Sequence, residues 1–274
     1  MSARRSRAEA HVVATEKTTA LVLRTTDFSE TSRVLVLWTR EFGKVRALAK
    51  GARRLRGAFE SALDLLNCCD IVLIRKTSGA LDLLTEARLR ECFSHLRGQL
   101  QAYYAASLIA EILSICAQEN DPHPDWFDQT ITTLRELGGQ EVYAVLLHWE
   151  LRALREVGLQ PVLDHCVQCR QPFVAPVADS LTWSAVAGGL VCPRCHVATP
   201  GRRQLPRDLF LQLRHLVAAS NQTPRAAHDR SPLTLPPQTC LELLHLLHEY
   251  WMHQLGQPLH LAVYFQPIQR SAGQ

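Results

Sequence analysis

The chain has 274 residues, of which 47% are hydrophobic and 20% are charged, and its formal net charge is +4. This balance excludes an intrinsically disordered chain, and the length favours two domains over one. No apolar run of about 18 residues occurs, which excludes an ordinary transmembrane helix.

The charge is unevenly distributed along the chain. Residues 1–97 hold 18 Lys and Arg against 11 Asp and Glu, whereas residues 98–274 hold 12 against 15. A basic N-terminal part is typical of a protein whose partner is a polyanion. Residues 1–15 read as a flexible, weakly basic tail. Because no apolar stretch follows its arginines, we expect no secretory signal and a cytoplasmic protein.

Residues 16–90 are predicted to form a small β-barrel. The expected strands are Thr18–Arg24, Arg33–Thr39, Lys44–Lys50, Asp70–Lys76 and Ala80–Leu84, the last two joined at a Ser78-Gly79 turn. Arg33–Thr39 alternates yet is apolar on both faces, as in a strand closed into a barrel. Five short strands in this space fit an OB-fold, which commonly binds single-stranded nucleic acid.

A basic stretch without acidic residues lies between Glu41 and Glu60. Its cations are the predicted DNA contacts: Lys44, Arg46, Lys50, Arg53, Arg54 and Arg56. Guanidinium groups suit phosphate oxygens, and each neutralised phosphate releases counterions. Trp38, Phe42 and Phe59 lie nearby as candidates for base stacking, although Trp38 is more typical of a core. The alternative is a solvated loop beside core aromatics.

Residues 91–265 change to a helical period. The predicted helices are Gln99–Gln118, Trp126–Leu137, Glu141–Val157, Pro206–Ala219 and Pro237–Leu255. Residues 220–236 read as a polar loop and residues 266–274 as a C-terminal tail. The predicted fold class is therefore α+β, with an N-terminal OB-fold barrel followed by an all-α domain.

Two CxxC pairs interrupt the helical domain, within residues 163–200. They are Cys166 with Cys169 and Cys192 with Cys195. Two such turns complete a tetrahedral shell of thiolates with no open position for water, which predicts one structural Zn²⁺ per chain. Ser180–Val186 and Leu190-Val191, joined by Gly188-Gly189, read as the hairpin of a zinc-ribbon-like insertion.

Two histidines and five further cysteines are not needed for this predicted metal site. His165 and His196 flank the pairs and are alternative ligands, but four cysteines already suffice. The remaining cysteines are expected to be buried small hydrophobes: Cys68, Cys69, Cys92, Cys116 and Cys240.

Motifs of catalysis are absent from the sequence. There is neither a GxxxxGK[ST] phosphate loop nor a GxSxG elbow. Residues 121–128 gather Asp121, Asp125 and Asp128, as a metal-dependent nuclease would need, but a helix start favours the same residue types. We therefore expect no enzyme and no catalytic residue.

The stretch FSETSRVLVLWTREFGKVRALAKGARR, residues 28–54, resembles the RecO family of recombination mediators. The cysteine pairs in a helical C-terminal domain match its zinc-bearing members, and the resemblance covers residues 16–265. It carries DNA contact onto Lys44, Lys50, Arg53 and Arg54; Arg46 and Arg56 are added on charge alone.

The resemblance implies a function and a set of partners. Such proteins bind single- and double-stranded DNA, anneal complementary strands without ATP and help to load RecA, at the nucleoid of a bacterial cytoplasm. RecR and the C-terminal tail of single-stranded-DNA-binding protein are the implied partners. Arg135, Arg152 and Arg155 are candidates for binding the carboxylate of that tail. An RNA-binding OB and zinc-ribbon protein of translation or transcription remains the alternative.

Overall fold

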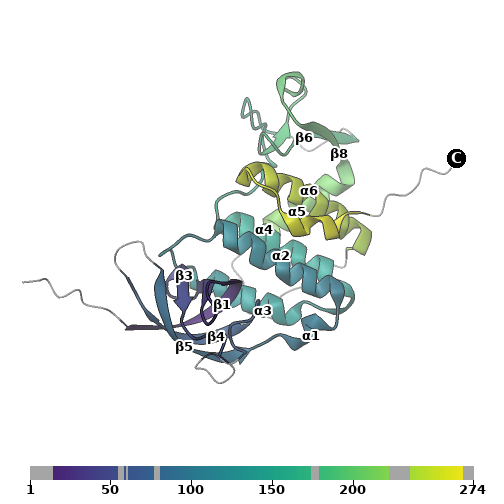
Figure 1. Cartoon of the computed structure of the whole chain (residues 1–274). Helices are drawn as coiled ribbons and strands as arrows, with labels where there is room; N and C mark the ends of the chain where they lie inside the picture. The colour runs from purple at the N-terminus through teal and green to yellow at the C-terminus, as the bar shows by residue number, and fades with distance from the viewer. Residues whose placement is uncertain are drawn as a thin grey trace, which may run out of the picture. The chain divides into compact units, whose positions relative to one another are not determined.

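The computed structural model describes residues 15–54, 59, 61–76, 81–173, 179–221 and 235–267 (Figure 1). The chain divides into two compact units. Unit 1 comprises residues 1–92 and 117–127, and unit 2 comprises residues 93–116 and 128–274. Within the described ranges, no helix has both the length and the apolar character needed to cross a membrane. Residues 1–14, Arg56, the Ser78-Gly79 turn, most of the 220–236 loop and residues 268–274 lie outside these ranges.

Unit 1 is a closed five-stranded barrel. Its strands are β1 (Thr15–Asp27), β2 (Arg33–Thr39), β3 (Gly43–Ala49), β4 (Cys68–Ile74) and β5 (Asp82–Glu91). The order around the barrel is β1-β2-β3-β5-β4, and every pair is antiparallel except β3 with β5. This is the topology of an OB-fold, so the predicted N-terminal fold is confirmed.

The barrel core follows from the alternation of small and branched side chains along the strands. Ala20, Val22, Leu35 and Leu37 point into the core together with Ile71 and their neighbours. Trp38 lies on the opposite face of β2 and is nevertheless fully buried. Its ring packs against Trp126 at 5.0 Å and Phe127 at 5.3 Å between centroids, which explains why both faces of β2 are apolar.

Residues 117–127 complete the barrel from a distant part of the sequence. The parallel pairing of β3 with β5 covers only Ala47–Ala49, which leaves the first half of β3 without a strand neighbour on that side. There Gln118 accepts a hydrogen bond from the Lys44 amide at 2.9 Å, and Glu119 bridges to Gly43. A backbone that would otherwise be an open strand edge is thereby paired.

Unit 2 is helical with a small sheet. Its main helices are α1 (Ser94–Arg97), α2 (Leu100–Cys116), α4 (Val142–Glu156), α5 (Arg207–Ser220) and α6 (Pro237–Leu255), and α3 (Pro124–Glu136) crosses the division between the units. Short 3₁₀ turns occur at η1 (Gly139–Glu141), η2 (His196–Ala198) and η3 (His260–Phe265). Helix α4 contacts α2, α5 and α6, so it lies at the centre of the bundle (Figure 1). The predicted α+β class is confirmed.

The sheet of unit 2 has one strand more than the predicted hairpin. Strand β6 (Ser180–Ser184) pairs with β7 (Gly189–Val191) on one side and with β8 (Arg202–Pro206) on the other. The third strand escaped prediction because Arg202–Pro206 buries only Leu205 and so shows no apolar alternation. It links the cysteine-bearing segment directly to α5, which begins at the next residue.

Candidate nucleic-acid interface and metal centre

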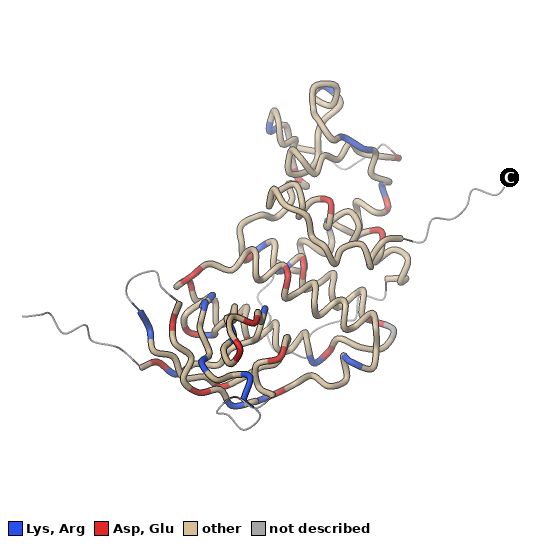
Figure 2. Tube along the Cα trace, viewed as in Figure 1, with Lys and Arg blue, Asp and Glu red and all other residues tan. Residues whose placement is uncertain are grey.

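The predicted DNA contacts that the structure describes lie along β3 and the loop that follows it. Lys44 and Arg46 alternate with the buried Val45 and Ala47, so both side chains point out of the barrel, Lys44 being half-buried and Arg46 exposed. Lys50, Arg53 and Arg54 are exposed in the loop. Figure 2 shows that basic and acidic positions both occur on the barrel. Five cations are thus brought to one strand and its continuation.

Arg53 differs from its neighbours because it holds the turn between β1 and β2. Its Nη1 donates to the Ser29 carbonyl oxygen at 3.1 Å and lies 3.6 Å from Asp27 Oδ2. Its backbone amide donates to the Thr31 carbonyl oxygen at 3.2 Å. The basic loop and the β1–β2 turn therefore form one structural element, and Arg53 is a positioning residue as well as a cation.

The aromatic residues proposed for base stacking are not available for it. Trp38 is 0% and Phe59 4% exposed. Phe42 packs against the barrel core, with the Arg75 guanidinium 5.1 Å from its ring. Phe42 lies in the turn between β2 and β3 and Phe59 in the loop after β3, and both rings pack on the barrel core, so the stacking prediction was wrong for both. The sequence analysis missed Phe28, which is 66% exposed in the β1–β2 turn; an aromatic residue among turn-forming Asp and Ser residues was the available signal.

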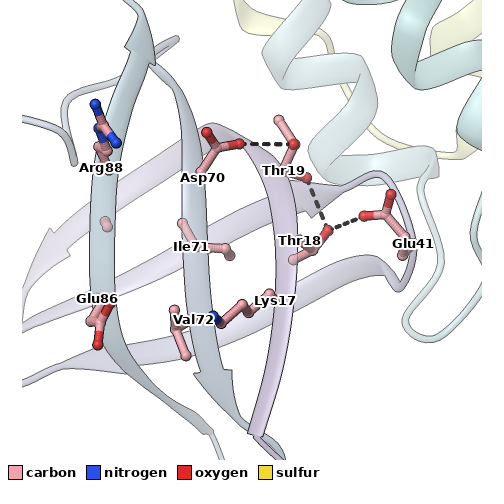
Figure 3. Close-up of a pocket in the computed structure, with 10 residues that line it drawn as sticks. Lys17, Thr18, Thr19, Glu41, Asp70, Ile71, Val72, Glu86 and Arg88 are labelled. Carbon is pink, nitrogen blue, oxygen red and sulfur yellow. Dashed lines mark hydrogen bonds between the residues drawn. The ribbon is translucent and has the colours of Figure 1, made fainter.

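One surface groove of unit 1 does not suit a polyanion. It is open, has a volume of about 610 Å³ and is lined by β1, β4, β5 and the turn that carries Glu41 (Figure 3). The hydroxyl of Thr18 donates to Glu41, and that of Thr19 donates to Asp70 Oδ1 at 3.0 Å. Three carboxylates but only two cations line it, so the groove offers phosphates no net positive charge.

The four predicted metal ligands converge in unit 2. The sulfurs of Cys166, Cys169, Cys192 and Cys195 all lie within 4.8 Å of one another, and Cys169 Sγ is 3.7 Å from Cys192 Sγ. A tetrahedron with Zn–S bonds of about 2.3 Å has sulfurs about 3.8 Å apart, so this spacing fits a tetrathiolate zinc site. Arg170, in the left-handed conformation at φ 60°, closes the first turn through its amide, which donates to the Cys166 carbonyl oxygen at 2.8 Å.

The charge state of the cluster also fits a divalent cation. Burial raises the pKa of Cys166, but the backbone amides of Cys169, Cys192 and Gln168 outweigh burial and lower it to about 6. The pKa of Cys192 is likewise lowered against burial by backbone amides. The pKa of Cys195 rises to about 12, chiefly through its hydrogen bond with Cys192. Cys166 and Cys192 thus lose their protons readily. A bound cation would favour the thiolate form of Cys195 as well.

The neighbouring histidines are outside this cluster. His165 Nδ1 lies 2.6 Å from Asp164 Oδ1, and His196 Nδ1 lies 2.5 Å from the Pro193 carbonyl oxygen. Among the described residues, the four cysteines are the one group arranged to hold a metal ion, and Asp121, Asp125 and Asp128 form no such group. The aspartates therefore give the nuclease interpretation no support.

The other five cysteines divide into two kinds. Cys68, Cys69 and Cys240 are buried as predicted, and burial raises the pKa of Cys69 to about 12. Cys92 is exposed and Cys116 is half-buried, which corrects the prediction that all five are buried. Cys92 directly follows the last residue of β5, and Cys116 is the last residue of α2.

Comparison with known proteins agrees with this architecture. Residues 13–93 match the family model "Recombination protein O N terminal", and residues 97–261 match "Recombination protein O C terminal". A "DNA repair protein RecO" of Rhodopirellula baltica is 36% identical over 226 residues, which are 82% of this chain and 83% of that protein. One of Anaeromyxobacter sp. strain K is 32% identical over 245 residues, covering 89% of this chain and 92% of its own length. The chain therefore belongs to the RecO family of DNA repair proteins.

Proposed function

We propose that this protein is a recombinational DNA repair mediator. In this proposal it binds single- and double-stranded DNA, anneals complementary strands without ATP and helps to load RecA on strands coated by single-stranded-DNA-binding protein. The observation that carries the proposal is the row of outward-facing cations on β3 and its loop, on an OB-fold barrel of a RecO-family chain. It includes no catalytic step and no catalytic residue.

The physical task in annealing is to reduce the repulsion between two phosphate backbones. Lys44, Arg46, Lys50, Arg53 and Arg54 are the described contacts we assign to phosphates, and Arg56 would extend the row. Each cation that neutralises a phosphate releases counterions, which favours binding of a second strand as well as the first. Because phosphate contacts carry no base information, such a surface serves strands of any sequence.

Annealing of two complementary strands coated with cognate single-stranded-DNA-binding protein, without ATP, tests this proposal. We expect wild type to anneal them and an Arg46→Ala/Lys50→Ala/Arg54→Ala variant to lose this ability. None of these three side chains forms an ion pair with the described residues, so the variant should fold normally. The slope of log affinity against log salt should fall by about 2 to 3, about one unit for each lost phosphate contact.

The control removes the same charge from another face of the barrel. Lys17 and Arg88 line the groove, and Arg90 on β5 donates to Thr19 Oγ1 at its edge, at 3.2 Å. A Lys17→Ala/Arg88→Ala/Arg90→Ala variant should anneal like wild type. Absence of annealing by wild type would refute the mediator function. Equal loss in both variants would show that net charge, not this surface, governs binding.

Two partner proteins belong to the proposal because the chain is a member of the RecO family. We propose that RecR and the C-terminal tail of single-stranded-DNA-binding protein bind this chain. Among the candidate arginines, Arg152 pairs with Glu156 at 2.8 Å, and Arg155 donates to the Ser220 carbonyl oxygen at 2.7 Å. In the same assay, free tail peptide should inhibit annealing of coated strands and leave that of bare strands unchanged. Inhibition of both alike would contradict tail recognition.

We also propose that Cys166, Cys169, Cys192 and Cys195 hold one structural Zn²⁺. The sulfur spacing and the depressed pKa values of Cys166 and Cys192 support this ligand set. Bound there, the ion would supply a fixed cross-link between two turns and no open coordination position. The small β6–β8 sheet, whose own apolar core is limited, would then be stabilised by the metal.

A further inference from the structure

Phe28 has the most exposed aromatic ring among the described residues. Its side chain is 66% exposed, compared with 51% for Tyr264 and 37% for Tyr103. Tyr264 stacks on Tyr104 with ring centroids 3.8 Å apart, whereas Phe28 makes no ring contact within the described part of the chain. Unlike tyrosine, phenylalanine has no hydroxyl group that could form a hydrogen bond with water. Within the part of the chain that the structure describes, the face of the Phe28 ring is thus open to solvent.

The turn that carries Phe28 is closed on both sides by hydrogen bonds. The Phe28 amide donates to the Ser32 carbonyl oxygen at 3.0 Å, and the Ser32 amide donates to Ser29 Oγ at 3.2 Å. Arg53 ties the same turn to the basic loop, and Asp27 pairs with Arg33 at 3.2 Å. Phe28 is therefore held in place next to the cations rather than carried on a free loop.

The position of this turn in the fold gives the ring a role. It joins β1 to β2, and in OB-folds this loop is one of those that contact oligonucleotides. The basic loop lies beside this turn, because the Arg53 amide donates to the Thr31 carbonyl oxygen. The loop carries Lys50, Arg53 and Arg54. Single strands bind to such surfaces by phosphate contacts combined with stacking of bases on aromatic rings.

We propose that Phe28 is a stacking platform for an unpaired base, adjoining the phosphate contacts of the basic loop. This inference rests on the proposed DNA binding and adds a preference for single strands at one contact. In a duplex both faces of each base are already stacked, so the ring gains a partner only from a single strand. A base held on Phe28 keeps its pairing edge open, which is what annealing requires.

The test compares single-strand and duplex affinity by fluorescence anisotropy. A Phe28→Ala variant should bind labelled oligothymidylate roughly tenfold more weakly, the order expected for one lost base stack, with duplex affinity unchanged. The salt dependence of single-strand binding should stay that of wild type, because no cation is removed. By contrast, Arg54→Ala should weaken binding of both single-stranded and duplex DNA. It should also reduce the slope of log affinity against log salt.

A Leu89→Ala variant is the matched control for loss of exposed apolar surface. Leu89 is 39% exposed on β5 of the same barrel. It belongs neither to the basic loop nor to the β1–β2 turn. Its variant should bind both ligands like wild type. If Leu89→Ala weakens single-strand binding as much as Phe28→Ala does, stacking is overturned in favour of a general apolar effect.

A Phe28→Trp variant gives a direct optical readout. All five native tryptophans are at most 1% exposed, so position 28 would carry the one exposed indole. Oligothymidylate should quench its red-shifted emission, and the variant should retain wild-type affinity. Suppose that wild type binds DNA, that Phe28→Ala binds it with unchanged affinity and that Phe28→Trp shows no quenching. This result would overturn the inference about Phe28 and leave the proposed function intact. Failure of wild type to bind any DNA would overturn the proposed function as well.

Discussion

The side chains of Glu150 and His248 form a pair at the centre of unit 2. His248 Nε2 lies 2.8 Å from Glu150 Oε1, and the two residues are 2% and 0% exposed. They join α4 to α6, the two helices with the largest shared contact in the bundle. Glu150 Oε2 and His248 Nδ1 have no hydrogen-bond partner among the described residues. Such a pair is costly to break because a lone buried carboxylate cannot recover its hydration.

We predict that His248→Ala lowers the free energy of unfolding by about 3 kcal/mol or more, since it removes a buried partner and leaves Glu150 unpaired. His245→Ala is the control. His245 lies one turn earlier on α6, at the surface, 3.3 Å from Glu249, and its loss should cost less than about 0.5 kcal/mol. Urea unfolding followed by circular dichroism measures both. Similar costs for the two variants would contradict a structural role for the pair.

Residue by residue, the sequence was informative where chemistry is local. The spacing of Cys166, Cys169, Cys192 and Cys195 defines a ligand set without knowledge of the fold, and the structure brings those sulfurs together. The fate of an aromatic ring depends instead on what packs over it. Trp38 is covered by Trp126 and Phe127, almost ninety positions away, whereas nothing described covers the ring of Phe28. Alternation cannot reveal such distant partners.

Among the elements, Gly43 at the start of β3 is the point where the distant segment 117–127 meets the barrel. Gly43 has φ +66°, and a Cβ atom there would lie 2.4 Å from the Asp121 carbonyl oxygen. The atom in the way belongs to the Asp121 backbone, which cannot move aside as a flexible side chain can. The tight approach therefore requires glycine for both its conformation and its size.

We expect Gly43→Ala to destabilise unit 1 by about 2 kcal/mol or more, because it combines a strained φ with a backbone clash. Gly51→Ala is the matched control: its φ is +78°, but a Cβ there meets only the Arg54 side chain at 3.7 Å. That change should cost about 1 kcal/mol from conformation alone. Guanidinium unfolding monitored by tryptophan fluorescence reports both variants. A Gly43→Ala variant no less stable than Gly51→Ala would argue against the close approach.

Element boundaries were predictable where periodicity was strong. Arg33–Thr39 and Pro237–Leu255 coincide with β2 and α6, and the other predicted helices agree with the structure to within two residues at each end. Strand β5 extends to Glu91, beyond the predicted Leu84, since its second half buries only Ala87 and shows no apolar run. Strand β8 was missed for the same reason: a short strand in a small sheet buries too little to show a pattern.

At the scale of the whole molecule, basic and acidic character separate between the two parts of the sequence. The first 97 residues carry a net +7 and the remainder a net −3. The barrel and the cysteine cluster belong to different units, so the proposed DNA surface and the proposed metal site rest on separate structural supports. Loss of the metal should therefore affect one property and spare the other.

We predict one zinc per chain by metal analysis, lost on Cys192→Ser. Because the proposed ion would stabilise the β6–β8 sheet, the variant should be cleaved by protease within residues 163–200, with wild-type affinity for duplex DNA. Cys92→Ser replaces an exposed cysteine outside the cluster and should retain both the zinc and protease resistance. A folded wild-type chain without metal would refute the zinc site.

The return of residues 117–127 to the barrel also bears on how the chain is made. A ribosome releases β1 to β5 first, yet the stretch that pairs with Lys44 and covers Trp38 follows only after α2. Until then the nascent barrel has an open strand edge and an uncovered indole, both of which invite association with other chains. A fragment ending after β5 would retain that state permanently. The compact unit at the N-terminus is therefore discontinuous in sequence, and a dissection of this protein would need to reattach residues 117–127 to the barrel.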